Sequence, residues 1–309
     1  MSVLQTQRKA IALLITVFFI MLITIAIGLG LKYANDASKT MKGELFLFQS
    51  SIILDDVLNV LKKSPELEKI ATATDLYMFL ESTPVIPFES NGVSVLIEIK
   101  HARSKINPNS FITSQRKEIF KQFLVNKMIN TEYATMLFDL MSGVKPDGGY
   151  ETDIFNENPY LFRDYVVSQK HLQELGKIYT KKLHEDNLKN IDTEELFYAS
   201  VDTNTSKDAN ASGYKIDVNY ATPLAWELML GCDETTALML SESGEIYDKD
   251  NIKDFLSEDQ FLSLQKFPYG FFEKYLYVTI KIQQQDIMSQ IKFEYNIDLK
   301  KGSNFVFEV

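Results

Sequence analysis

Two segments of this chain carry acidic and amide side chains at a spacing that could bind a cation. In the longer segment such side chains alternate, as they do in the first half of a calcium-binding loop. Lys207 stands where that loop needs a glycine, and Gly213 stands where it needs a bidentate glutamate. The other segment places its acidic residues beside two glycines. The candidate ligands are Asp147, Glu151, Asp153, Asp202, Asn204 and Asp208.

These candidate ligands leave two interpretations open. One is a calcium site, because hard cations bind carboxylate and amide oxygens. The other is a pair of solvated loops, which the sequence favours because neither segment completes a cation-binding pattern. The sequence therefore establishes no cofactor. If either loop binds a metal, calcium is the ion that its oxygen ligands would suit.

Residues that usually carry catalysis are few and scattered. The three histidines are His101, His171 and His184, with no HExxH or similar spacing between them, and we expect them at the surface or at helix ends. Cys232 follows Gly231 and lacks the surroundings of a catalytic thiol, so we expect a small buried hydrophobe. GxSxG, Walker and GxGxxG motifs are missing from the sequence. The chain is expected not to be an enzyme.

The overall charge argues against nucleic acid as a partner. The chain has 309 residues and a formal net charge of −10. Neutralising phosphates needs clustered lysine and arginine, so nucleic acid is not an expected partner. The single cysteine excludes an intrachain disulfide.

The element that must position the rest of the chain is an uncharged apolar run from Ala10 to Leu31. As a helix it would span about 33 Å, and a bilayer core is about 30 Å thick. A cleaved secretory signal usually has a shorter apolar core. A plain membrane anchor and a type IV pilin-like leader are the other interpretations.

The residues before the run fit the pilin-like leader. A short polar head ends in Arg8 and Lys9, a small residue follows, and the apolar helix starts at once. Cleavage would then fall between Ala10 and Ile11. The basic pair favours a cytoplasmic head, which predicts a single-pass protein with a periplasmic or extracytoplasmic body. With a pilin-like leader, the membrane would be the bacterial inner membrane and the body would lie in the periplasm.

Beyond the apolar run the sequence stays helical as far as Lys63, and Ser64-Pro65 is a stop signal. Strands follow, because apolar and polar residues alternate over Val93–Lys100 and again over Tyr275–Val309. The second stretch contains turns at Gln283–Asp286 and Lys300–Asn304. Such a meander has one apolar face that needs a cover, for which the long helix is the candidate.

Short amphipathic segments fill the middle of the chain, and several begin with capping residues. Thr222 precedes a proline, and Ser257 has Gln260 at capping-box spacing. Asp192 begins another segment in the same way. The predicted helices are Ser114–Lys127, Thr131–Met141, Gln169–Leu183, Asp192–Ala199, Pro223–Leu230 and Ser257–Leu264.

Several landmarks in order then resemble one family, the type II secretion minor pseudopilin K, or general secretion pathway protein K. Two of them resemble its paired-asparagine motifs, and a third resembles its acidic Gly-Gly loop. The final strands also fall in the place expected for the family. The landmarks are Ile106-Asn107-Pro108-Asn109, Asp139-Leu140-Met141 followed by residues 148–153, and Ile216-Asp217-Val218-Asn219-Tyr220-Ala221-Thr222-Pro223.

The chain also departs from that family. Ala10 stands where the leader peptidase usually meets glycine, and Asp217 replaces an asparagine. The tryptophan and second aspartate of the family's Asp-Trp-Ile-Asp run are missing. These differences suggest a distant branch. From the residues alone, the asparagines are expected to satisfy local backbone groups at turns rather than to form a site.

The resemblance implies an α+β fold in which a pilin-like long N-terminal helix packs on a small antiparallel sheet that carries a large all-helical insert. The expected parts are a leader (1–10), a transmembrane half-helix (11–31), a pilin-like domain (32–102 and 268–309) and the insert (103–267). Calcium in the helical domain would also follow from the resemblance.

The implied function is that of a minor pseudopilin at the tip of a periplasmic pseudopilus in type II protein secretion. Its partners would be other minor pseudopilins, the prepilin peptidase, which also implies N-methylation, and the inner membrane. Like that family, the chain lacks the glutamate of most pilins, since Ile15 stands in its place. The alternatives are a minor pilin of a type IV pilus or DNA-uptake pseudopilus, and a membrane-tethered periplasmic enzyme or binding module.

Overall fold

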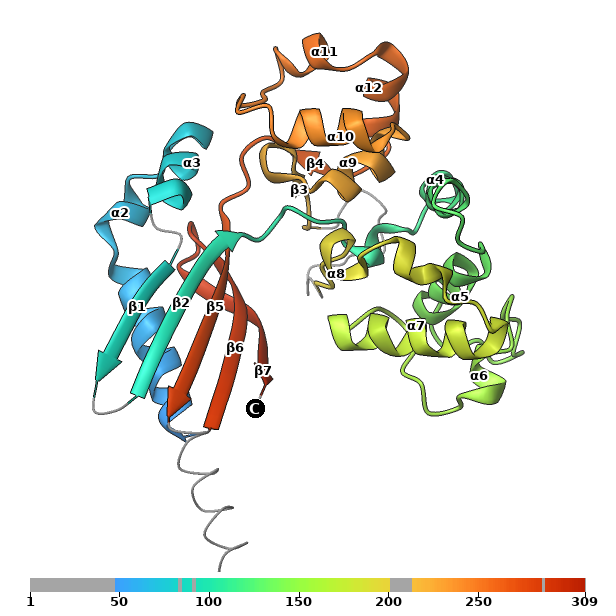
Figure 1. The fold of residues 1–309 in the computed structure, drawn as a ribbon, viewed down its shortest axis with the longest axis horizontal. Helices are drawn as coiled ribbons and strands as arrows, with labels where there is room; N and C mark the ends of the chain where they lie inside the picture. Colours follow the sequence, from blue (N-terminus) through green and yellow to red (C-terminus); the bar gives the residue numbers. More distant parts are fainter. Residues whose placement is uncertain (1–47, 83–84, 91–92, 201–212, 285–286, 309) are drawn as a thin grey trace, which may run out of the picture. The chain divides into compact units, whose positions relative to one another are not determined.

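A computed structural model describes residues 48–82, 85–90, 93–200, 213–284 and 287–308 (Figure 1). The chain divides into two compact units, residues 1–59 and residues 60–309. None of the helices in these described ranges is long and apolar enough to cross a membrane. The predicted span Ala10–Leu31, the cleavage position between Ala10 and Ile11, and Ile15 all lie outside the described residues.

The helix expected to end near Lys63 does so. Residues 48–63 are helical, and a second short helix, α2 (Pro65–Glu68), follows. The Ser64 hydroxyl accepts a hydrogen bond from the Leu67 N–H, and Pro65 occupies the first helical position. The predicted stop is therefore confirmed, whereas packing of the long helix on the sheet stays a prediction.

One antiparallel sheet of five strands has the order β1-β2-β5-β6-β7 (Figure 1). The early hairpin, β1 (Val85–Ser90) and β2 (Val93–His101), lies beside the C-terminal meander. The meander consists of β5 (Tyr275–Gln284), β6 (Ile287–Asn296) and β7 (Lys301–Glu308). Strands far apart in the sequence thus form one sheet, and the whole middle of the chain connects β2 to β5.

Alternation along the strands places apolar side chains inside, as predicted. Val278 and Ile280 are fully buried on β5, and Ile291 and Phe293 are fully buried on β6. The helix α3 (Ala73–Ser82), which precedes the sheet in the sequence, contacts β2, and its Leu76 is completely buried. The period-two pattern was sufficient to identify these strands.

The predicted turn Lys300–Asn304 is wrong, because β7 already begins at Lys301. The chain reverses earlier, where the Asn296 side chain accepts a hydrogen bond from the Leu299 N–H. Lys300 then adopts a left-handed conformation with φ 52°. The polar residues at the start of β7 resemble a turn, which explains the error.

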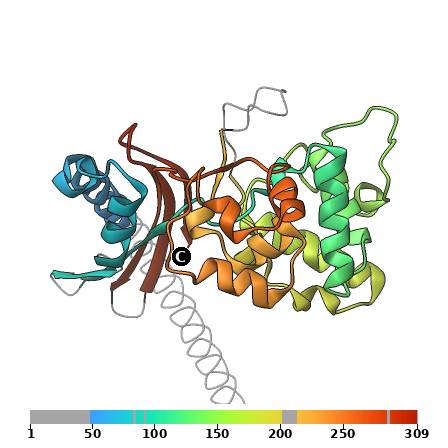
Figure 2. The same ribbon diagram turned by 90° about the horizontal axis from the view of Figure 1, so that it is seen from above.

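The middle of the chain is helical, as predicted, and Figure 2 shows its helices gathered together. Two residue pairs, β3 (Ile216–Asp217) and β4 (Tyr269–Gly270), form a small parallel ladder. The α-helices are α4 (Ser114–Asn126), α5 (Glu132–Met141), α6 (Ile154–Glu157), α7 (Gln169–Leu183), α8 (Thr193–Leu196), α9 (Pro223–Leu230), α10 (Glu234–Ser241), α11 (Ile252–Phe255) and α12 (Glu258–Leu264). The described part of this region also contains the 3-10 helices η1 (Pro108–Ser110), η2 (Asn187–Asn190) and η3 (Val218–Tyr220).

Capping chemistry sets several of these boundaries. The Thr222 hydroxyl accepts from the Ala225 N–H, and Ser257 with Gln260 forms the complete capping box. Asp192 caps α8, but that helix is shorter than predicted, because Phe197 is extended and bridges to Ile106. A tertiary contact therefore overrides the local helical pattern.

The helices share one hydrophobic core. Its buried members extend in sequence from Ile106 to Phe267 and include Trp226 and Phe120, both fully buried. Phe120 stacks against Phe111 with ring centroids 4.8 Å apart. These limits fall inside the expected insert of 103–267, while the domain boundaries themselves stay a prediction.

Candidate functional site

A buried ion pair lies just after β2, where the chain leaves the sheet. Arg103 Nη2 donates to Glu294 Oε1 on β6 at 2.7 Å, and both side chains are almost completely buried. The guanidinium lies between the rings of Tyr214 and Tyr275, 4.2 Å and 3.9 Å from their centroids. Removing one partner of such a pair leaves a buried uncompensated charge, which is strongly destabilising. Arg103 thus fixes the point where the chain leaves the sheet.

His101 lies two residues earlier, and its contacts determine its tautomer. Its Nδ1 accepts the Arg103 N–H at 3.1 Å, so its Nε2 carries the proton and donates to the Glu273 carbonyl at 2.8 Å. The ring stacks on Tyr220 with centroids 4.0 Å apart. Burial lowers the pKa of His101 to about 3. The residue is therefore a neutral, immobilised imidazole at neutral pH.

Asp217 is the acidic neighbour of that imidazole. Its Oδ2 lies 3.4 Å from His101 Nε2 and accepts the Glu273 N–H at 2.8 Å, while Oδ1 accepts the Asn219 N–H at 3.0 Å. Burial raises the pKa of Asp217 to about 7, and the two backbone donors oppose this rise. Asp217, His101 and Glu273 thus form one buried polar cluster, which we call the junction cluster.

The paired asparagines hold backbone loops, as expected from their residue type, although most of their partners are distant in sequence. Asn109 accepts the Val166 N–H at 2.7 Å and donates back to the Val166 carbonyl at 3.0 Å. Asn219 accepts the Tyr247 N–H at 2.6 Å and donates to the Phe271 carbonyl at 2.8 Å. Each asparagine side chain therefore accepts one backbone hydrogen bond and donates another, as a peptide group does.

The acidic Gly-Gly loop is held in a similar way. Asp139 on α5 is buried and accepts the backbone N–H groups of Glu151 at 3.0 Å and Thr152 at 2.7 Å. The Thr152 hydroxyl also donates to it at 2.7 Å. Sequence reasoning identified this aspartate only as a landmark, because its partners lie across the loop.

The predicted metal ligands are only partly within the described residues. Asp147 accepts the Gly149 N–H, and Asp153 pairs with Lys182, which lowers the pKa of that carboxyl. In the described ranges no three His, Cys, Asp or Glu side chains cluster closely enough to bind a metal ion. The other candidates, Asp202, Asn204 and Asp208, lie outside those ranges, so the calcium site remains an untested prediction.

The histidines and Cys232 are the other reactive side chains that the sequence singled out. The expectation of surface or helix-end histidines is wrong for His101, which is buried at the end of β2. It is correct for His171, which is buried but lies in the first turn of α7, and for His184, which terminates α7. Cys232 is only partly buried, and burial raises the pKa of its thiol to about 11. A protonated thiol is a weak nucleophile.

The comparisons with known proteins bear on the fold. No family model matches this sequence, and no curated protein matches it. A solved structure does match: a chain in the GspK-GspI-GspJ complex of the type 2 secretion system from enterotoxigenic Escherichia coli. The TM-score is 0.56 at 10% sequence identity, and the alignment covers 88% of this chain and 97% of that chain. The chain has a pseudopilin-like fold.

That pseudopilin-like fold confirms the expected α+β class. The likeness extends over nearly the whole of both chains, so it includes the large segment between β2 and β5 as well as the sheet. At this low identity the agreement concerns architecture. Sequence landmarks held by backbone hydrogen bonds, such as Asn109 and Asn219, serve that architecture directly.

Proposed function

We propose that this protein is a minor pseudopilin at the tip of a periplasmic pseudopilus, acting in type II protein secretion. The observation that carries the proposal is the fold likeness across 88% of the chain to a component of a minor-pseudopilin complex. The ordered landmarks that resemble pseudopilin K support the same role. The partners would be sister minor pseudopilins.

The N-terminal sequence supports membrane delivery and processing. The uncharged run Ala10–Leu31 is long enough for a bilayer, and Arg8 and Lys9 precede it. In this proposal the prepilin peptidase cuts before Ile11, the new amino terminus is methylated, and the body lies in the periplasm. The buried contacts described above then serve to hold a rigid assembly subunit rather than a catalytic centre.

Mass spectrometry of the N-terminal peptide of the membrane-extracted protein tests this role. We expect a chain that starts at N-methylated Ile11. Replacing Ala10 by a bulky residue, Ala10→Trp, should leave the head attached, and Gln7→Ala should be processed normally as the matched control. An intact Met1 or Ser2 start, or a cut after Gly28 or Gly30, would rule out the leader and favour a simple anchor or secretory signal.

A further inference from the structure

Both edge strands of the five-stranded sheet present apolar side chains to solvent. The sheet that the described residues form ends in β1 on one side and in β7 on the other (Figure 1). The exposed apolar side chains are Val85, Ile86 and Phe88 on β1, and Phe305, Val306 and Phe307 on β7. An edge strand offers a row of backbone N–H and C=O groups to any extended chain, and apolar β-forming side chains favour such pairing. A regular strand at either edge would therefore be a place for another copy of the sheet to add.

Pro87 interrupts the free edge of β1. It lies opposite Leu96 of β2, and the pairing of the two strands continues without a shift from Val85 to Ser90. Proline has no N–H, so a position that keeps this pairing intact is one whose backbone nitrogen faces the free edge. An added strand would lose one hydrogen bond there and would meet the pyrrolidine ring.

The free edge of β7 is interrupted in another way, by a β-bulge. Ser303 of β7 lies opposite Glu294 of β6. The next pair in the register joins Val306 to Lys292, so two residues of β7 stand opposite one residue of β6. The extra residue is Asn304, which adopts a left-handed φ of 54°. A bulge bends its strand and increases the local twist, so an added strand cannot stay in register on both sides of it.

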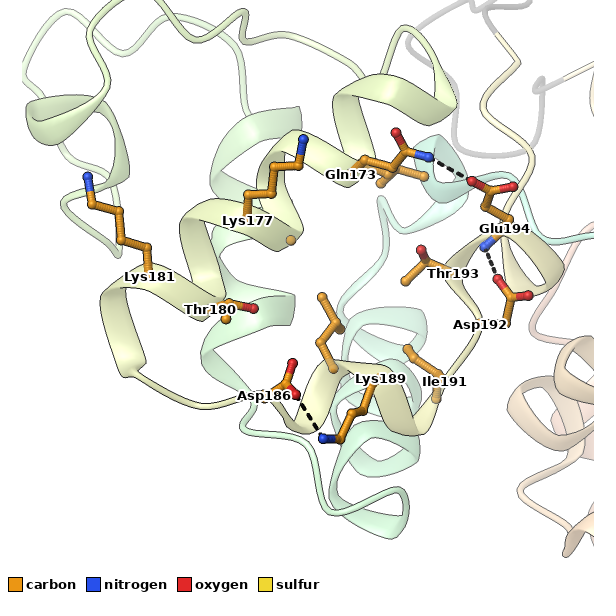
Figure 3. A pocket seen from close by; sticks show the side chains of 13 residues that line it. Gln173, Lys177, Thr180, Lys181, Asp186, Lys189, Ile191, Asp192, Thr193 and Glu194 are labelled. Carbon is orange, nitrogen blue, oxygen red and sulfur yellow. Dashed lines mark hydrogen bonds and ion pairs between the residues drawn. The ribbon is translucent and has the colours of Figure 1, made fainter.

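The side chain of Asn304 is anchored in the helical region. Its amide donates a hydrogen bond to the Ser200 hydroxyl at 3.0 Å, and Ser200 is almost completely buried. The Ser200 carbonyl in turn accepts a hydrogen bond from the Asn107 amide at 2.9 Å. Ser200 follows α8, which is tied to α7 by the hydrogen bond from Gln173 to Glu194 at 2.7 Å (Figure 3). The extra residue of the bulge is thus fixed from outside the sheet.

We propose that Pro87 and the bulge at Asn304 prevent two copies of this chain from joining edge to edge through their sheets. An open edge on either side would be enough for pairing, so the apolar sheet needs a block at both edges. The structure has one block at each edge, of a different chemical kind. This inference concerns the sheet alone and does not depend on a pseudopilus role.

The first test opens the β1 edge with Pro87→Val, which restores the N–H and keeps an apolar side chain suited to a strand. The readout is the protein mass of the full chain in detergent, by size-exclusion chromatography with light scattering. We expect the mass to rise with concentration to about twice that of the unaltered chain or more, because the opened edge pairs with a second copy. The unaltered chain should keep a constant mass.

Two further variants control the β1 test. Pro146→Val makes the same replacement in an exposed turn outside the sheet and should leave the mass unchanged. The double variant Pro87→Val/Phe88→Lys should also stay unassociated, because a lysine on an edge strand opposes pairing. This second control separates pairing through an opened edge from aggregation that follows a loss of folding.

The second test removes the bulge by deleting Asn304. Phe305 would then stand opposite Phe293 in a regular ladder, and the residues on either side would keep their faces of the sheet. We expect the same rise of mass with concentration. Asn304→Gly is the matched control, because glycine readily adopts the same left-handed φ and keeps the extra residue while losing the contact with Ser200. It should elute as the unaltered chain does.

Two results would overturn the proposal. One is an unchanged mass at every concentration for both Pro87→Val and the Asn304 deletion, with circular dichroism spectra like that of the unaltered chain. The other is association of Pro87→Val/Phe88→Lys as strong as that of Pro87→Val, which would mean that unfolding rather than an opened edge drives association. Association of only one of the two opened variants would overturn the block at the other edge.

Discussion

His101 and Asp217 together hold one proton over a wide pH range. Burial depresses the pKa of His101 to about 3 and raises the pKa of Asp217 to about 7. Between these pH values the titratable proton of the folded pair is on the Asp217 carboxyl, and His101 is neutral with its one proton on Nε2. In the unfolded chain the proton sits on the histidine between the ordinary pKa values of about 4 and 6.5. Both states bind one proton there, so the pair contributes no pH dependence to stability in that window.

Single substitutions should therefore expose opposite slopes. In His101→Gln, Asp217 remains with a raised pKa, which binds a proton more tightly in the folded state. Its stabilising effect is present at low pH and is lost as pH rises from about 4 to about 7. In Asp217→Asn, His101 remains with a lowered pKa, and stability falls as pH drops below about 6.5 towards 3.

The measurement is the urea-unfolding free energy of each variant from pH 4 to 7.5, as its difference from the unaltered chain at each pH. Taking the difference removes the slopes of other groups, including Glu273, whose pKa burial also raises. The double variant His101→Gln/Asp217→Asn is the control and should differ from the unaltered chain by a constant. Parallel slopes in the two single variants would contradict the shared proton.

At the residue scale the sequence predicts local contacts and misses distant ones. The helix caps at Thr222 and Ser257 follow from adjacent residues and are confirmed. The junction cluster joins residues 101, 217 and 273, and only tertiary structure brings these together. Nothing in the sequence around His101 predicted its tertiary contacts beyond its place at the end of an alternating strand. Asp217 stood out only as a departure from the asparagine of the resembled family.

At the scale of elements, β5 is the strand on which the sheet depends, since it pairs with both β2 and β6. Val278 is fully buried on it, between Ile99 and Phe293 in the ladder register. Val278→Asp would bury an unpaired charge, so we expect the free energy of unfolding to fall by about 3–5 kcal/mol. Chemical denaturation measured by circular dichroism tests this.

Gln283→Asp is the matched control for that strand, because Gln283 is exposed on the same strand and should change stability by less than about 0.5 kcal/mol. An unchanged denaturation midpoint for Val278→Asp would mean that the sheet assignment is wrong. The same result for Ile280→Asp, which removes a second fully buried residue of β5, would strengthen that contradiction.

Element types were predictable wherever one face of the element is buried. Period-two alternation identified β5 and β6, and helical periodicity placed α7 at its observed limits. The helix α8 was misplaced because its end depends on a distant partner, Ile106, and the start of β7 was misplaced because its polar residues resemble a turn. The helix α10 was missed, although Asp233 caps it in the same way as the predicted caps.

At the scale of the molecule, the proposed tip position rests on two features. Most pilins carry a glutamate that pairs with the amino terminus of a neighbouring subunit, whereas this chain has Ile15 at that position. An unpaired charged terminus in an apolar surrounding is costly, so a subunit without the glutamate is best placed at a fibre end. The bulk of the helical region between β2 and β5 would also obstruct stacking of another subunit on top.

The most direct test of this account is co-purification of the tagged soluble part, residues 33–309, with the soluble parts of the two other minor pseudopilins from the same source. A second experiment places the Ile15→Glu variant in the whole chain. If the missing glutamate confines the subunit to the tip, this variant should be incorporated below the tip. We predict one stable complex with one copy of each subunit, by size-exclusion chromatography with light scattering, and no filaments of this chain alone. A chain that polymerises by itself, or elutes as a monomer beside its sisters, would contradict the tip role.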